Sequence, residues 1–131
     1  MGTRSTVKFY DEFQNQILSV YQQFDGYIEG VGYKLANWLK KKKVINGFSD
    51  EKMSEGYANG MGCLAAQYIA EHKDKIGSLY VATADEEEGY NYKVKFIDEK
   101  LIIEVNDYFV GTPDELLNHK WQDDDDDDEN K

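Results

Sequence analysis

Cysteine and histidine are scarce in this 131-residue sequence, and each shortage argues against a class of protein. The single Cys63 cannot form an intramolecular disulfide, so a disulfide-stabilised secreted domain is excluded and a reducing, cytoplasmic location is expected. Two histidines without clustered ligands argue against a zinc site, and we expect no metal and no cofactor. No secretory segment is evident, and no apolar run approaches the roughly 20 residues that span a bilayer, so no membrane partner is expected.

Acidic residues, in contrast, are abundant, and the formal net charge is −11. Residues 122–131 hold seven acids and one lysine (−6), whereas residues 1–121 hold nineteen acids against fourteen bases (−5). Consecutive acids repel one another, so we expect residues 1–121 to form a single domain and residues 122–131 to form a disordered tail. An acidic surface repels phosphate groups, which disfavours direct binding of nucleic acid and remains compatible with a basic partner protein.

Alternation of apolar and polar residues predicts strands, because successive side chains of a strand point to opposite faces. Two such segments near the N-terminus are separated by a short polar turn and predict a hairpin. Three more follow in the second half of the chain and predict a meander. The expected strands are 6–10, 16–22, 78–84, 90–97 and 100–105.

A helical period begins after Gly30, where Val31, Leu35, Trp38 and Leu39 share one face. This helix ends in the four lysines 40–43, which fit the negative end of a helix dipole better than they fit a nucleic-acid contact.

A second helix is expected from Asn59, its N-cap, to Ile76 and Gly77, after a short helical turn over residues 49–57. The sequence Thr112-Pro113-Asp114-Glu115 is a capping box that predicts a short third helix, against which Trp121 would dock.

These elements follow the order ββααβββα and predict an α+β fold. We expect an antiparallel sheet of about five strands with two main helices on one face, a short C-terminal helix and the acidic tail. The predicted sheet edges and the ten tyrosines are compatible with a homodimer.

Arg4 is the only arginine beside fourteen lysines, and a guanidinium recognises carboxylate or phosphate in two-point fashion, which an ammonium cannot. We therefore expect Arg4 to anchor a ligand or to pair with Asp25. Asp25 lies in the glycine-rich joint, together with Tyr27. The segment Asn59-Gly60-Met61-Gly62 is a second candidate, since the N–H groups of a helix N-terminus attract anions. Close packing of helix against sheet would explain these two glycines equally well.

Evidence for an enzyme is weak. Cys63 and His72 lie nine residues apart on one predicted helix and point to opposite sides, so they cannot act as nucleophile and base. Acid–base chemistry by Asp25 with Tyr27 is the remaining option, and we interpret the chain as more consistent with a binding protein.

Three blocks of residues resemble a group of small, mostly uncharacterised proteins of bacteriophages and bacterial genomes. They are Gly2-Thr3-Arg4-Ser5, the joint Phe24-Asp25-Gly26-Tyr27 with its Gly-x-Gly helix start, and the block NGMGCLAAQ at residues 59–67. The resemblance covers about residues 2–70. The group often has Pro and His where this chain has Ile28 and Val31, so no role for that histidine carries over. The resemblance implies a phage-type accessory protein that acts in the host cytoplasm.

Two functional hypotheses follow. In the first, Arg4, Asp25, Tyr27 and Asn59-Gly60-Met61-Gly62 converge on one pocket for a small anionic, nucleotide-like ligand, such as a host defence signal. In the second, the acidic surface imitates DNA and covers the basic face of a host defence protein. A small hydrolase that uses Asp25 is a weaker third hypothesis. We favour the pocket, because charge alone does not explain the single Arg4 or the glycine-rich joints.

Overall fold

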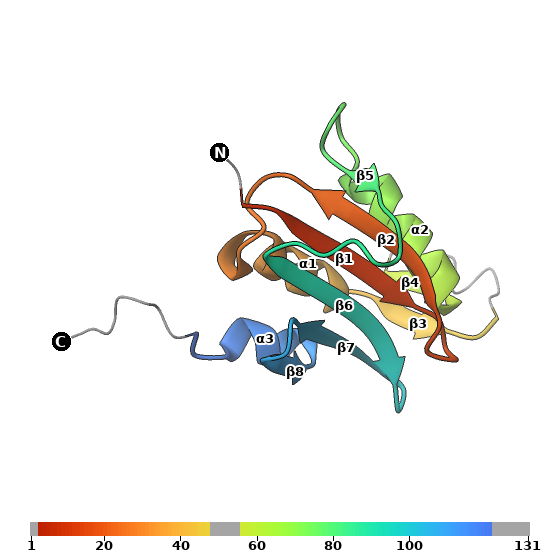
Figure 1. Ribbon diagram of the computed structural model, residues 1–131. Coiled ribbons are helices and arrows are strands. Elements are labelled where there is room, and N and C mark those ends of the chain that lie inside the picture. Colours follow the sequence, from red (N-terminus) through yellow and green to blue (C-terminus); the bar gives the residue numbers. More distant parts are fainter. Residues whose placement is uncertain (1–2, 48–55, 122–131) are drawn as a thin grey trace.

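The structure, a computed structural model, describes residues 3–47 and 56–121 (Figure 1). Six strands form one mixed sheet in the order β5-β2-β1-β6-β7-β8. The strands are β1 (Ser5–Tyr10), β2 (Gln16–Gln22), β5 (Tyr80–Val81), β6 (Tyr90–Ile97), β7 (Lys100–Val105) and β8 (Phe109–Gly111). A separate pair of parallel strands, β3 (Lys43–Ile45) and β4 (Tyr57–Asn59), joins the two main helices.

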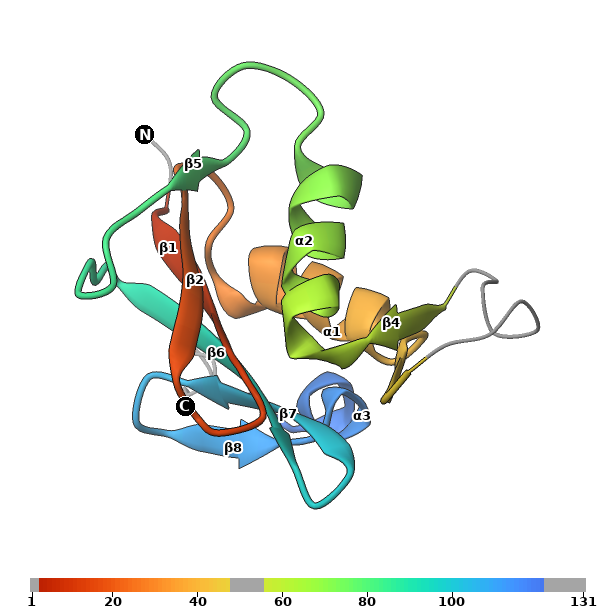
Figure 2. The ribbon, with the colours of Figure 1, turned by 90° about the vertical axis from the view of Figure 1, so that its right-hand side faces the viewer.

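Three helices cover one face of the six-stranded sheet (Figure 2). They are α1 (Tyr33–Leu39), which continues from a π-helical turn (Ile28–Gly32), α2 (Gly60–His72) and α3 (Pro113–Asn118). Within the ranges 3–47 and 56–121, no helix is both long and apolar enough to cross a bilayer.

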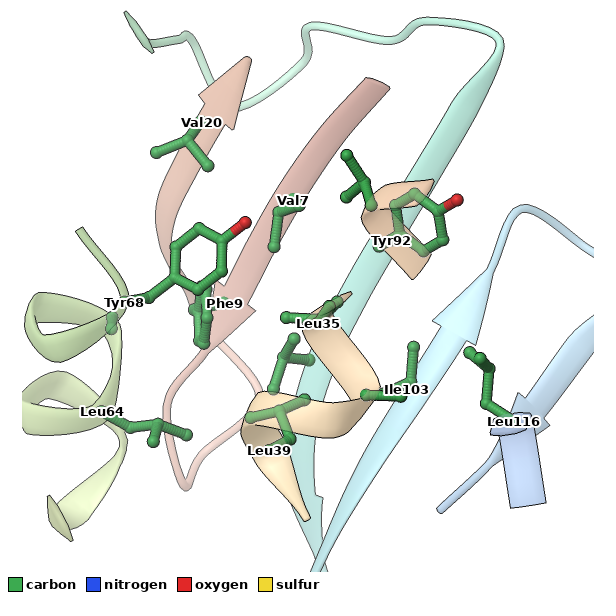
Figure 3. Packing of buried hydrophobic residues seen from close by; sticks show 14 of the residues in the cluster. Val7, Phe9, Val20, Leu35, Leu39, Leu64, Tyr68, Tyr92, Ile103 and Leu116 are labelled. Atoms are coloured by element: carbon green, nitrogen blue, oxygen red, sulfur yellow. The ribbon is translucent and has the colours of Figure 1, made fainter. Parts of the chain in front are cut away.

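The core lies between the sheet and these helices, and β1 runs through its centre (Figure 3). Val7 and Phe9 are fully buried, and the Phe9 ring centroid lies 5.3 Å from that of Tyr68 on α2. Leu35 of α1 and Ile103 of β7 close the core on the other side of β1. The alternating apolar residues predicted for β6 and β7 do face the helices, since Tyr92, Val94, Ile103 and Val105 are all buried.

The opposite face of the sheet is crossed by residues 82–89, which we call the strap (Figures 1 and 2). The strap begins where the Ala82 N–H donates to the Ser19 carbonyl oxygen at 2.8 Å. The Lys8 ammonium, whose side chain is 2% exposed, donates to Glu87 Oε2 at 3.1 Å. Beside it, Thr6 donates to Asn91 Oδ1 at 2.7 Å. As a result, β1 is buried on both of its faces.

The α+β class is confirmed, but the predicted arrangement of an antiparallel five-stranded sheet is wrong. β1 pairs with β6 in parallel, so the sheet is mixed and has six strands. The period of two shows which side chains face the core but not which strands become neighbours. The parallel pair requires a long crossover, and the chain between β2 and β6 supplies it.

Two element boundaries also differ from the predictions. The second helix ends at His72 rather than at Ile76, which is 96% exposed because residues 73–78 form a turn closed by Ser78. The strand predicted over 78–84 is reduced to Tyr80–Val81, since the chain leaves the sheet edge to form the strap. Most of the helical turn predicted over 49–57 and the whole tail 122–131 lie outside the described residues.

The prediction for the third helix is confirmed in detail. The Thr112 side chain accepts from the Glu115 N–H at 3.2 Å, and the Glu115 carboxylate accepts from the Thr112 N–H at 2.8 Å. Trp121 docks as expected, because its Nε1–H donates to the Leu116 carbonyl oxygen at 3.2 Å.

The glycine-rich joint that links β2 to α1 is shaped by close backbone contacts. The Asp25 residue has a φ of 60°, and its carbonyl oxygen accepts from the Val31 N–H at 2.8 Å. A Cβ atom added to Gly30 would lie 2.1 Å from this same oxygen. The chain therefore needs glycine at position 30 because a side chain would collide with backbone.

We predict that Gly30→Ala lowers the free energy of unfolding by roughly 2–3 kcal/mol, as expected for overpacking against an atom that cannot move away. Gly62→Ala is the matched control, since a Cβ at Gly62 meets nothing within 4 Å. That substitution should be neutral or stabilising by up to about 1 kcal/mol, because alanine favours a helix. Urea denaturation of both variants measures the difference, and equal stabilities would contradict the steric explanation.

Candidate functional site

The first two predicted site segments meet at one end of β1, but they meet through their backbones. The Gly26 N–H donates to the Thr3 carbonyl oxygen at 2.9 Å. A Cβ at Gly26 would lie only 2.9 Å from the Arg4 carbonyl carbon. The Arg4 side chain is exposed and forms no ion pair with Asp25 or with any other residue in 3–47 and 56–121. The predicted ion pair between Arg4 and Asp25 is therefore not formed.

Asp25 and Tyr27 do interact on the surface of the joint. The Tyr27 hydroxyl donates to Asp25 Oδ1 at 3.3 Å, and both residues are exposed. The negative charge of Asp25 raises the pKa of the Tyr27 hydroxyl. The pair presents a hydrogen-bonded carboxylate to solvent.

The third predicted segment, Asn59 to Gly62, is already occupied by the protein's own carboxylate. Helix α2 begins at Gly60, and the Met61 N–H donates to Glu12 Oε2 at 2.7 Å. Asn59 occupies the N-cap position, as predicted, but its side chain does not cap the helix, because its Oδ1 accepts instead from the Gly47 N–H at 2.7 Å. Gly62 is exposed and contacts nothing that would require a glycine. The attraction of this helix end for anions is therefore satisfied internally by Glu12.

These three segments do not form one pocket. Arg4 precedes β1, whereas Glu12, which contacts Met61, follows it. Residues 5–10 of β1 alone span about 17 Å at the usual rise of a strand. The predicted convergence of Arg4, Asp25 and Tyr27 with Asn59, Gly60, Met61 and Gly62 is therefore wrong, because a fully extended strand separates its two halves.

A different concave site lies at the Glu12 end of the molecule. It is an open depression of about 330 Å³ between the end of α1, the β6–β7 turn and the start of α3. Four lysines from two distant segments line it: Lys40, Lys42, Lys43 and Lys100. We call it the lysine depression. Its charged lining holds four lysines against two acids, Glu99 and Asp114, and is therefore locally cationic in a chain of net charge −11.

Most of the lysines of the depression have no ion-pair partner in the described part of the chain. Lys42 is held by Glu71 at 3.1 Å and lies 4.9 Å from the Trp38 ring centroid. Lys40, Lys43 and Lys100 are exposed and have no ion-pair partner among residues 3–47 and 56–121. Glu99 and Asp114 are likewise without an ion pair in that part of the chain. Charges of both signs thus face the depression without neutralising one another.

Sequence reasoning missed this site because its parts lie far apart along the chain. The lysines 40–43 have an adequate explanation as the end of a helix, and no motif links them to Lys100. Only the antiparallel β6–β7 turn and the position of α3 bring these residues together. The one available signal was the unusual density of lysine in an acidic chain.

His72 lies outside both sites and is part of a structural stack. Its ring stacks on Tyr68 at 4.3 Å and meets Trp38 edge-on at 5.2 Å, while its Nδ1–H donates to the Tyr68 carbonyl oxygen at 2.8 Å. Burial lowers the pKa of the imidazole. Within residues 3–47 and 56–121, no group of three or more His, Cys, Asp or Glu side chains is placed to hold a metal ion.

Comparisons with protein-family models, with curated proteins and with solved structures yield no match for this chain.

We predict that Glu12→Ala lowers the free energy of unfolding by about 1 kcal/mol, the usual effect of removing a helix N-cap. Sulfate should restore more stability to this variant than to the wild type, because the vacated N–H groups of α2 become an anion site. Glu12→Gln, which keeps an acceptor oxygen, is the control and should lose less. Thermal denaturation in matched chloride and sulfate measures the effect. An unchanged stability of Glu12→Ala would show that this carboxylate does not cap α2.

Proposed function

We propose that this protein binds a small anionic ligand in the lysine depression, and that it acts as a phage-type accessory protein which captures such a signal in its host. The observation that carries the proposal is the convergence of four lysines on one concave site in an acidic chain. The volume of about 330 Å³ is in the range of small-molecule sites. The resemblance of residues 2–70 to small phage proteins supports the accessory role.

The local charge of the lysine depression is opposite in sign to the net charge of the chain. A polyvalent phosphate would be repelled by most of this surface and attracted to the lysine depression, where Lys40, Lys43 and Lys100 offer ammonium groups without partners among the described residues. Hydrogen bonds to charged groups each contribute about 1.5–3 kcal/mol, so three such contacts contribute about 4.5–9 kcal/mol, which corresponds to millimolar to micromolar binding.

We predict that sodium tripolyphosphate raises the melting temperature of the wild type at low ionic strength, because a ligand that binds only the folded state stabilises it. The double variant Lys43→Ala/Lys100→Ala should bind at least about tenfold more weakly by calorimetry, since each lost charged contact is worth more than 1.4 kcal/mol.

The matched control is Lys75→Ala/Lys120→Ala, which removes the same charge from two exposed lysines outside the depression. It should keep wild-type affinity. Equal losses in both double variants would mean that net charge alone drives binding, and the absence of any binding to the wild type would overturn the proposal.

A second candidate function is an acidic inhibitor that covers a basic face of a host protein. The strap favours it, because a hydrogen bond to the Glu88 carboxylate and the negative charges of Glu88 and Asp85 raise the pKa of Glu86. This concentration of acid lies on the sheet face opposite the helices (Figures 1 and 2).

We predict that a pull-down from host lysate captures a complex which dissociates near 0.5 M salt, where charges are screened within a few ångströms. Asp85→Asn/Glu88→Gln should weaken that complex, whereas Lys43→Ala/Lys100→Ala should not.

A further inference from the structure

The lysine depression has an apolar part that a simple inorganic anion would not use. Five apolar residues line it beside the charged groups: Leu39, Val44, Phe96, Leu101 and Pro113. Leu39 is 1% exposed and belongs to the core, so it gives the site a firm floor. Phe96 and Leu101 are half-buried neighbours across β6 and β7, and their side chains keep surface open to the depression. A ligand that covers this surface gains roughly 25 cal/mol for each Å² removed from water.

The two acids in the lining also argue against a ligand that carries only negative charge. Glu99 and Asp114 face the same depression as Lys43 and Lys100, and neither is neutralised by an ion pair within residues 3–47 and 56–121. Their carboxylates accept hydrogen bonds and would repel a bare polyanion. A ligand with amino or hydroxyl donors at one end and phosphates at the other end would satisfy both signs of charge.

From these features, and on the basis of the proposed function, we propose that the ligand of the lysine depression is a nucleoside polyphosphate. Its planar base would cover the apolar floor beside Phe96, and its phosphates would pair with Lys40, Lys43 and Lys100. Its amino and hydroxyl groups would donate to Glu99 and Asp114. The volume of about 330 Å³ and the open mouth suit a ligand whose base lies against the apolar floor and whose phosphates extend along the cationic rim.

The test compares ATP with sodium tripolyphosphate by calorimetry on the full chain, without divalent metal and at one ionic strength. The two probes share the triphosphate and differ in the nucleoside. ATP should bind roughly tenfold more tightly than tripolyphosphate, since stacking of a base on an aromatic ring contributes about 1–3 kcal/mol. Phe96→Leu, which keeps the site apolar and removes the ring, should lower the affinity for ATP several-fold and leave that for tripolyphosphate unchanged.

The outcomes separate the two proposals. If tripolyphosphate binds and ATP binds no more tightly, the nucleoside inference is overturned and the anion site stands. If neither probe binds, the proposed function itself fails. If Phe96→Leu lowers both affinities equally, the ring supports the structure of the site and does not contact a base, and the nucleoside inference is overturned.

A second variant, Glu99→Gln, should preserve or raise the affinity for tripolyphosphate, because it removes a repulsive charge. A lower affinity of this variant for tripolyphosphate would contradict the role given to the carboxylates.

Discussion

The burial of β1 on both faces is the constraint on which the rest of this fold depends. Toward the helices, Val7 and Phe9 supply the centre of the core. Toward the strap, the same strand presents Thr6 and the ammonium of Lys8, which is 2% exposed and requires a partner. An ammonium buried without a partner would lower the stability of the fold by several kcal/mol. Glu87 of the strap supplies that partner. The strap thereby leads the chain from β5 over β2 and β1 to β6, which then pairs with β1 in parallel.

This constraint also explains how much of the fold could be predicted from the sequence. Predictions that depend on interactions over a few residues were confirmed. These are the capping box at Thr112, the buried helical face of Val31 and Leu35, and the alternation in β6 and β7. The parallel pairing of β1 with β6 could not be predicted, because it depends on contacts between residues far apart in the sequence. One of these contacts joins Lys8 to an acid that looks, in sequence, like any other residue of an acidic turn. The strand β5 is short because the chain leaves the sheet edge after Val81 to form the strap.

The candidate site could be predicted even less well, and for a related reason. A helix N-terminus preceded by glycine is a correct signal for attraction of an anion, but the sequence does not show which anion is nearest. Here Glu12 arrives from the other end of β1 and fills the position at 2.7 Å from the Met61 nitrogen. The prediction based on the single Arg4 concerned the opposite end of the strand. There the backbone of this segment, and not the Arg4 guanidinium, makes the close contacts.

The two anion-attracting places in this molecule therefore differ in whether an internal carboxylate reaches them. At the start of α2, Glu12 from the turn after β1 accepts a hydrogen bond from the Met61 N–H, so a carboxylate of the protein itself occupies this anion site. At the lysine depression, Glu99 and Asp114 face the same space as Lys43 and Lys100, yet they form no ion pair in the described part of the chain. An acidic chain has enough carboxylates to neutralise every lysine, and Lys8, Lys42 and Lys95 are all neutralised in this way. Three lysines and two acids without an ion pair among the described residues thus surround one concave, partly apolar surface, and the proposed ligand, with both donors and phosphates, would complement them.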